Sequence, residues 1–337
     1  MKMRRIKNLL LNTAERSGFL RLAQIPGHEA GNHLIVLAYH RVAEADDLLS
    51  NRLYDLASAT PRQFDEQMRL LSTCFHPVSA EEVLNALNGG KPLPAQAVLV
   101  TVDDGYRDFK ETIFPITQKY GIQPVLFVPT AYVGDGVFWW DRLFNAINNT
   151  NLLQVDTPLG RFSLQDKAAR VIAFDMLANH VRMQSFEKAR SDIEQLCDRL
   201  TPDSIQSISY TLNWDELRAL SAEGVTIAPH THTHPILTHI PIEKARDEIR
   251  TSRDLIKQHI GRTLPVFAYP DGREHAVSKE LGLMLKEEGV QMAFTMSDRI
   301  SRLKQDDPQL FPRLTPYFDS LPQFHLRLTA MRAAAKN

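Results

Sequence analysis

Short runs of apolar, mostly β-branched residues recur along the chain, and each run ends abruptly in polar residues. Runs of this length and composition are typical of strands buried in a parallel sheet. The pattern predicts six strands, at residues 33–39, 97–102, 124–129, 225–228, 266–269 and 291–295.

Segments with helical periodicity lie between these strands, and several begin next to a residue that can cap a helix. The clearest cover residues 60–72, 80–87, 213–222 and 242–260. Alternating strands and helices predict an α/β fold. If the parallel strands close into a (β/α) barrel, the polar residues that follow each strand gather on one rim.

The stretch from 137 to 209 breaks this alternation, because it is charged, compatible with helices and without a clear strand. We expect it to be a helical insertion over the rim of a domain that spans residues 31–320. Its opening aromatic cluster, Phe-Trp-Trp, suits either a packed core or a platform for sugar rings. Helical segments are predicted on both sides of the domain, at 1–30 and 321–337.

Composition narrows the possible partners. The 337 residues are 43% hydrophobic and 23% charged, with a formal net charge of -1. This balance gives no electrostatic reason to bind nucleic acid and suits a neutral polymer or a small molecule better. The two cysteines, Cys74 and Cys197, are far apart, which argues against a disulfide framework and against a cysteine-based zinc site.

The N-terminus starts with basic residues, but the apolar stretch after them is too short for a signal peptide or a membrane span. Residues 6–22 have the pattern of an amphipathic helix. Such a helix either contacts a membrane surface or packs on its own domain. We expect a cytoplasmic protein, with peripheral membrane contact as an open alternative.

The sharpest local pattern is a histidine at every second position from 230 to 234. Residues i and i+4 share one face of a helical turn, so His230 and His234 would direct their imidazoles at one point. Thr231 stands where zinc proteases need glutamate, which excludes that class. A catalytic zinc site usually has three protein ligands, and Asp104, at the end of a predicted strand, supplies the third. Taken alone, Asp103-Asp104-Gly is also compatible with a turn or a helix cap.

Taken together, these motifs resemble the polysaccharide deacetylase family, the NodB-homology domain of the carbohydrate esterase family 4 type. The family's first motif is Thr-Phe-Asp-Asp-Gly and its second is His-Ser/Thr-x-x-His. Segments 101–105 and 230–234 match them, and 39–41, 127–129 and 267–272 extend the resemblance. The resemblance covers roughly residues 33 to 300, apart from the insertion.

The resemblance implies a deformed (β/α) barrel in which Asp103 is the general base. Asp104, His230 and His234 would hold a divalent metal, with zinc expected and cobalt, nickel or iron compatible with the same ligands. The metal would activate water and polarise the acetyl carbonyl. A backbone N–H near Asp271 would stabilise the oxyanion, within a third motif formed by Tyr269, Pro270, Asp271 and Gly272.

Two positions depart from the family pattern. No late Leu-x-His motif supplies a general acid, so we expect His40 to take that role, with a purely structural histidine as the alternative. Ala268 occupies the place of an arginine that pairs with the base. Arg41, Arg273 or the metal itself would then have to replace that charge.

The function expected from these residues is a metal-dependent hydrolase that removes N-acetyl groups from GlcNAc-type sugars. The substrate would be a polysaccharide, a glycan precursor or a lipid-linked saccharide. Two alternatives remain open: an amidase for a small non-carbohydrate amide, and a catalytically inactive sugar-binding protein of the same fold.

Overall fold

The computed structural model describes residues 33–44, 57–182, 184, 186–201, 210–316 and 320–334. Its central sheet has the strand order β12-β1-β5-β6-β9, with β4 also paired to β5. All pairs are parallel except β1 with β12. The bounds are β1 His33–Tyr39, β4 His76–Pro77, β5 Ala97–Val102, β6 Val125–Val128, β9 Thr226–Pro229 and β12 Ser301–Arg302.

A second parallel pair, β10 (Val266–Ala268) and β11 (Met292–Phe294), lies beside β9. The segment after β12 then joins β11 back to β1, since Phe311 bridges to Phe294 and Leu314 bridges to Leu37. The strands therefore run around an incompletely hydrogen-bonded ring. This is the deformed barrel that was predicted, closed by isolated bridges rather than by a full ladder.

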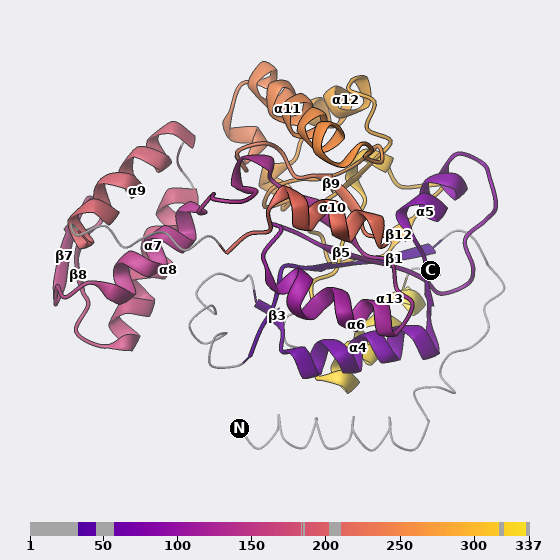
Figure 1. Cartoon of the computed structure of the whole chain (residues 1–337), viewed down its shortest axis with the longest axis horizontal. Helices are drawn as coiled ribbons and strands as arrows, with labels where there is room; N and C mark the ends of the chain where they lie inside the picture. Colours follow the sequence, from indigo (N-terminus) through magenta and orange to yellow (C-terminus); the bar gives the residue numbers. More distant parts are fainter. Residues whose placement is uncertain are drawn as a thin grey trace.

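Helices pack on the outside of this ring (Figure 1). Capping boxes begin three of them, with Thr60, Ser79 and Asn213 as the caps, which is why the capping signals were visible in the sequence. The helices are α4 Pro61–Cys74, α5 Ala80–Leu87, α6 Phe114–Lys119, α10 Trp214–Ala222, α11 Ile242–Ile260, α12 Lys279–Glu287 and α13 Leu321–Ala334. A short parallel pair, β2 (Arg41–Val42) and β3 (Ala57–Ala59), follows β1.

Both faces of the sheet are buried, which explains the continuous apolar runs. In β1, Ile35 and Leu37 belong to one hydrophobic cluster, whereas Leu34 and Val36 belong to another on the opposite face. The six predicted strands are all present, with ends that differ by at most one residue, whereas the two- and three-residue strands β2, β3, β4 and β12 were not predicted.

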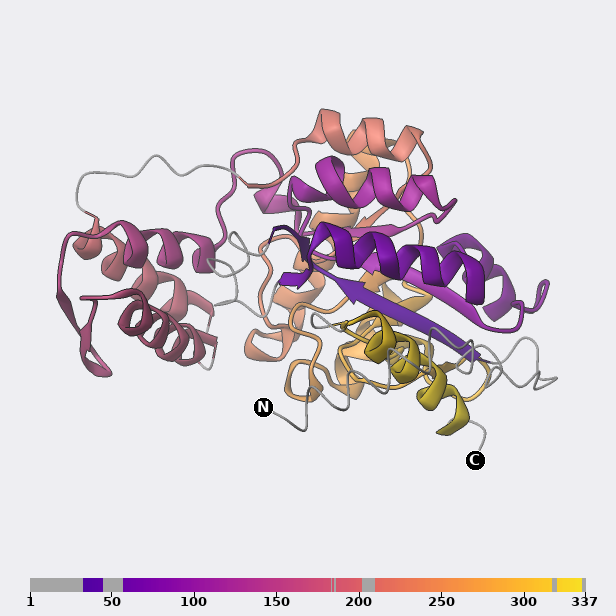
Figure 2. The same ribbon diagram turned by 90° about the horizontal axis from the view of Figure 1, so that it is seen from below.

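The insertion forms a lobe beside the barrel, as both views show (Figures 1 and 2). It has its own hydrophobic cluster, which includes Phe138 and Trp140. The expectation that it holds no strand is wrong, because an antiparallel hairpin pairs Val155 with Phe162. Each strand has only four residues, of which one is buried and the others largely face solvent. The apolar signal in the sequence was therefore too weak to detect. The elements are α7 Trp139–Asn149, β7 Gln154–Thr157, β8 Gly160–Ser163, α8 Lys167–Arg182 and α9 Phe186–Leu200.

The predicted amphipathic helix near the N-terminus lies outside the described residues, so membrane contact and cytoplasmic location stay predictions. Among the residues that the structure does describe, no helix is long and apolar enough to cross a membrane. Cys197 is buried in the hydrophobic cluster of the insertion, and Cys74 packs partly buried against the barrel core.

Candidate active site and metal centre

The first half of the site follows β5. Asp103 and Asp104 come directly after the strand, and both side chains are almost fully buried. The chain leaves the strand through two left-handed residues, with φ of 75° at Asp104 and 71° at Gly105. A Cβ on Gly105 would lie 3.0 Å from a methyl group of Val128, so glycine suits both the conformation and the space.

The second half follows β9, which ends at Pro229. His230 and His234 were expected on one face of a helical turn, and that expectation is wrong. The segment is an irregular loop in which Thr231 and His234 have φ of 67° and 59°. Within the loop, the N–H of His234 donates to the hydroxyl of Thr231 at 3.0 Å. The two imidazoles still meet, because the loop turns back on itself.

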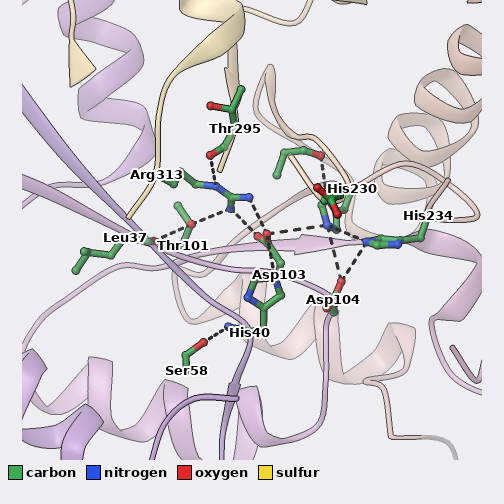
Figure 3. Close-up of polar contacts among 12 residues, drawn as sticks. Leu37, His40, Ser58, Thr101, Asp103, Asp104, His230, His234, Thr295 and Arg313 are labelled. Atoms are coloured by element: carbon green, nitrogen blue, oxygen red, sulfur yellow. Dashed lines mark hydrogen bonds and ion pairs between the residues drawn. The ribbon is translucent and has the colours of Figure 1, made fainter. Parts of the chain in front are cut away.

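Side-chain atoms of Asp104, His230 and His234 converge to within 4.8 Å of one another, in an arrangement that could hold a metal ion (Figure 3). The two Nε2 atoms are 3.2 Å apart. The Oδ1 atom of Asp104 lies 3.8 Å from Nε2 of His230 and 3.5 Å from Nε2 of His234. The structure therefore brings together the three ligands that the sequence predicted.

The histidines are prepared to act as neutral ligands. Nδ1 of His230 lies 2.7 Å from the carbonyl oxygen of Ala268, which can only accept, so Nδ1 carries the proton and Nε2 keeps its lone pair. Burial lowers the pKa of His230 to about 4. Burial, followed by the neighbouring His230, places the pKa of His234 well below its ordinary value. Both lone pairs are thus available at neutral pH.

The environment of Asp104 suits a cation between these groups. Its Oδ1 atom is buried and accepts no hydrogen bond from the described residues. Burial, and then the charges of Asp103 and Asp141, raise the pKa of Asp104 well above its ordinary value. A buried carboxylate oxygen without a partner is costly, and a bound cation would satisfy it. The donor set of two imidazoles and one carboxylate is typical of catalytic zinc.

Asp103 has a different environment, because it pairs with Arg313. The guanidinium donates to both carboxylate oxygens at 2.7 Å, and Arg313 is 1% exposed. Arg313 also donates to the hydroxyl of Thr101 at 3.1 Å (Figure 3). Burial alone would raise the pKa of Asp103, but the charge and hydrogen bonds of Arg313 hold that pKa below its ordinary value.

Arg313 supplies the cation that Ala268 does not, and the two substitutes suggested by the sequence are wrong. The Nε atom of Arg41 lies 3.6 Å from Oδ2 of Asp108, and a terminal guanidinium nitrogen of Arg273 lies 3.7 Å from Oδ2 of Asp271. Both arginines thus pair with other carboxylates. The only sequence signal for Arg313 was the missing charge beside Asp103, since position 313 itself lies in no recognisable motif.

His40 lies on the other side of Asp103, with its Nε2 atom 3.8 Å from Oδ2 (Figure 3). The backbone N–H of His40 donates to the hydroxyl of Ser58 at 3.0 Å, which fixes the chain after β1. The side chain of His40 is 17% exposed, compared with 2% for Asp103. His40 is therefore the more accessible of the two groups. His325, which follows Phe324 late in the chain, is buried on α13.

The third motif follows β10 on the same rim, joined to His230 through the carbonyl of Ala268. The N–H groups of Tyr269 and Gly272 already donate to the carbonyls of Phe294 and Pro270. Proline has no N–H. Of the four predicted residues, Asp271, which has φ of 60°, is the one whose N–H the oxyanion prediction can use.

The insertion reaches the candidate metal centre through its aromatic residues. Trp140 and Phe138 stack on each other, and each ring contacts the imidazole of His234 edge to face. The indole N–H of Trp140 donates to the hydroxyl of Tyr106, which donates to Asp141. These buried contacts support the interpretation of Phe138 and Trp140 as core residues.

Backbone strain is concentrated at this site. Five non-glycine residues in the described part of the chain have positive φ, and four of them lie in the loops after β5, β9 and β10. Such conformations persist only where the surroundings hold them, and they cluster at functional sites. The four are Asp104, Thr231, His234 and Asp271.

Residues 90–293 match the family model described as polysaccharide deacetylase, which covers more than half of the chain. The chain therefore belongs to the polysaccharide deacetylase family, as its motifs predicted.

Among curated proteins, the chain is similar to poly-β-1,6-N-acetyl-D-glucosamine N-deacetylase of Escherichia coli (strain K12). The two are 24% identical over 284 residues. The match covers 82% of this chain but only 36% of that protein, so the chain spans about a third of the length of this relative.

Two solved structures share the fold. A Streptococcus pyogenes deacetylase, PplD, in complex with acetate has a TM-score of 0.58 at 16% identity, over 89% of this chain and 99% of that one. IcaB from Ammonifex degensii has a TM-score of 0.57 at 19% identity, over 89% and 98%. These likenesses concern the fold, including the deformed barrel.

The turn after Asp104 predicts a difference between two glycine substitutions. Gly105→Ala should lower the free energy of unfolding by about 2–4 kcal/mol, because a left-handed alanine is strained and its Cβ crowds Val128. Gly261→Ala, at φ of 87° with open space around the new Cβ, should cost only about 1 kcal/mol. Urea unfolding of both variants measures this. Equal losses would show that the packing against Val128 is unimportant.

The Arg313 pair predicts a pH-dependent loss of stability. Arg313→Met should cost about 3–5 kcal/mol at pH 7, because it leaves a buried carboxylate unpaired. Arg302→Met, which removes a half-exposed partner of Asp306, should cost at most about 1 kcal/mol.

The sign of the pH effect follows from linkage. In the native protein the pKa of Asp103 is depressed, so its stabilisation is present above the unfolded value of about 4 and is lost in stronger acid. Without Arg313, burial raises that pKa, so the stability deficit should shrink from pH 8 to pH 5. Urea unfolding across this range measures it, and a constant deficit would contradict the prediction.

Proposed function

We propose that this protein is a metal-dependent hydrolase that removes N-acetyl groups from GlcNAc-type sugars. The observation that carries the proposal is the convergence of Asp104, His230 and His234 beside a separate, ionised Asp103. Membership of the family supports it, and so does the relative in Escherichia coli, whose name describes an N-deacetylase of a GlcNAc polymer. The substrate would be a polysaccharide, a glycan precursor or a lipid-linked saccharide.

Asp104, His230 and His234 would hold a divalent cation, for which we propose zinc. When bound, it would activate water as the nucleophile and polarise the acetyl carbonyl. Cobalt, nickel and iron are compatible with the same donors.

Asp103 would act as the general base. Arg313 holds the pKa of Asp103 low, so the carboxylate is ionised at neutral pH before the reaction begins. It can therefore take a proton from the attacking water. The same pairing lowers its basicity. Its fixed position, with both oxygens held by one guanidinium, favours the transfer by orientation.

His40 would protonate the leaving nitrogen, so that the amide and water yield acetate and the free amine. It is close to Asp103 yet more exposed, which suits a group that must reach the substrate. The N–H of Asp271 would stabilise the oxyanion of the tetrahedral intermediate. His40 would thus act on the leaving nitrogen, and the N–H of Asp271 on the negative charge that develops on the carbonyl oxygen.

Acetate release from β-1,6-linked and β-1,4-linked GlcNAc oligomers, with and without added zinc, tests this function. Wild-type protein should release acetate only with metal. Asp103→Asn should lower kcat by about 10²–10⁴-fold while the protein still binds metal. His234→Ala should lose both metal and activity.

Asp247→Asn is the matched control, because it removes an exposed carboxylate elsewhere on the surface and should keep full activity. Thermal unfolding of each variant establishes that it is folded before it is assayed. Metal binding without acetate release would favour an amidase for another small amide. Absence of metal binding in the wild type would favour an inactive sugar-binding protein.

A further inference from the structure

The loop from His230 to His234 needs external support, because it presents two ligands from a strained backbone. Thr231 and His234 are both left-handed, although neither is glycine. Residues in this conformation are held there by the surrounding structure rather than by their own preference. The groups that hold the loop therefore determine where the imidazole of His234 lies.

On one side, the segment after β6 binds the loop through the loop's carbonyl groups. The N–H of Thr130 donates to the carbonyl of Thr231 at 3.3 Å, and the N–H of Ala131 donates to that of His232 at 2.9 Å. Tyr132 adds its hydroxyl, 3.3 Å from the carbonyl of Thr233. These contacts fix three carbonyls of the loop and leave the N–H groups of His232 and Thr233 to another partner.

That partner is Glu248, which extends from α11. Its Oε2 atom accepts from the N–H of His232 at 2.8 Å and from the N–H of Thr233 at 2.7 Å. Its Oε1 atom accepts from the hydroxyl of Thr233 at 2.7 Å. One carboxylate thus receives three hydrogen bonds from the two residues immediately before His234, and bonds to a charged acceptor are among the stronger ones.

We propose that Glu248 is a positioning residue, which fixes the loop so that His234 completes the metal centre. The proposal rests on the proposed metal-dependent function. It assigns Glu248 no contact with substrate or metal. Its carboxylate extends from α11, not from a strand end on the rim, and acts through the backbone of His232 and Thr233.

The test is a titration of the metal-free protein with Co²⁺, followed by its visible absorption, which reports both affinity and coordination geometry. Glu248→Ala should weaken cobalt binding by at least about tenfold and change the spectrum. Glu248→Gln keeps an oxygen acceptor for the two N–H groups and should retain most of the affinity. Asp247→Asn, an exposed carboxylate on the same helix, should behave as wild type.

Thr233→Val removes only the hydroxyl contact, so it decides the question if Glu248→Ala does not fold. It should weaken cobalt binding by a smaller factor than Glu248→Ala. A wild-type affinity and spectrum in Glu248→Ala, or in Thr233→Val if the former is unfolded, would overturn the role of Glu248 and leave the proposed function intact. Failure of the wild type to bind cobalt would overturn both.

Discussion

The guanidinium of Arg313 makes two hydrogen bonds to the carboxylate of Asp103 in the interior of the protein, and much of the site depends on this pair. The segment that carries Arg313 also bridges β11 to β1, so ring closure and orientation of the base are coupled. Because the pair is buried, loss of either partner leaves an uncompensated charge. The same interaction lowers the pKa of Asp103 below its ordinary value, whereas the pKa of the adjacent Asp104 is raised above it.

These opposite environments divide the work between two carboxylates. Asp103 is paired, oriented and ionised, whereas Asp104 is buried with an oxygen that lacks a partner and faces two neutral imidazoles. A cation between Asp104 and the histidines would supply the missing compensation. The left-handed residues in the surrounding loops point to the same place, since strain of this kind is retained where the arrangement of the site requires it.

Much of this arrangement was predictable, because local patterns encode it. Buried strands are continuous apolar runs, and the residues after them share a rim, so Asp104, His230 and His234 could be brought together from sequence. Arg313 could not, because it lies 210 positions from Asp103 and its role comes from the way the ring closes. The irregular conformation of the loop from His230 to His234 was missed for a similar reason, since it depends on Glu248 from α11, a separate helix.

The most direct test of the account is a crystal structure of the zinc-loaded protein, with anomalous scattering recorded on both sides of the zinc absorption edge. We expect one strong anomalous peak within bonding distance of Asp104, His230 and His234, with Asp103 still paired to Arg313. A peak coordinated by Asp103, or no peak at this position in protein that binds zinc, would contradict it.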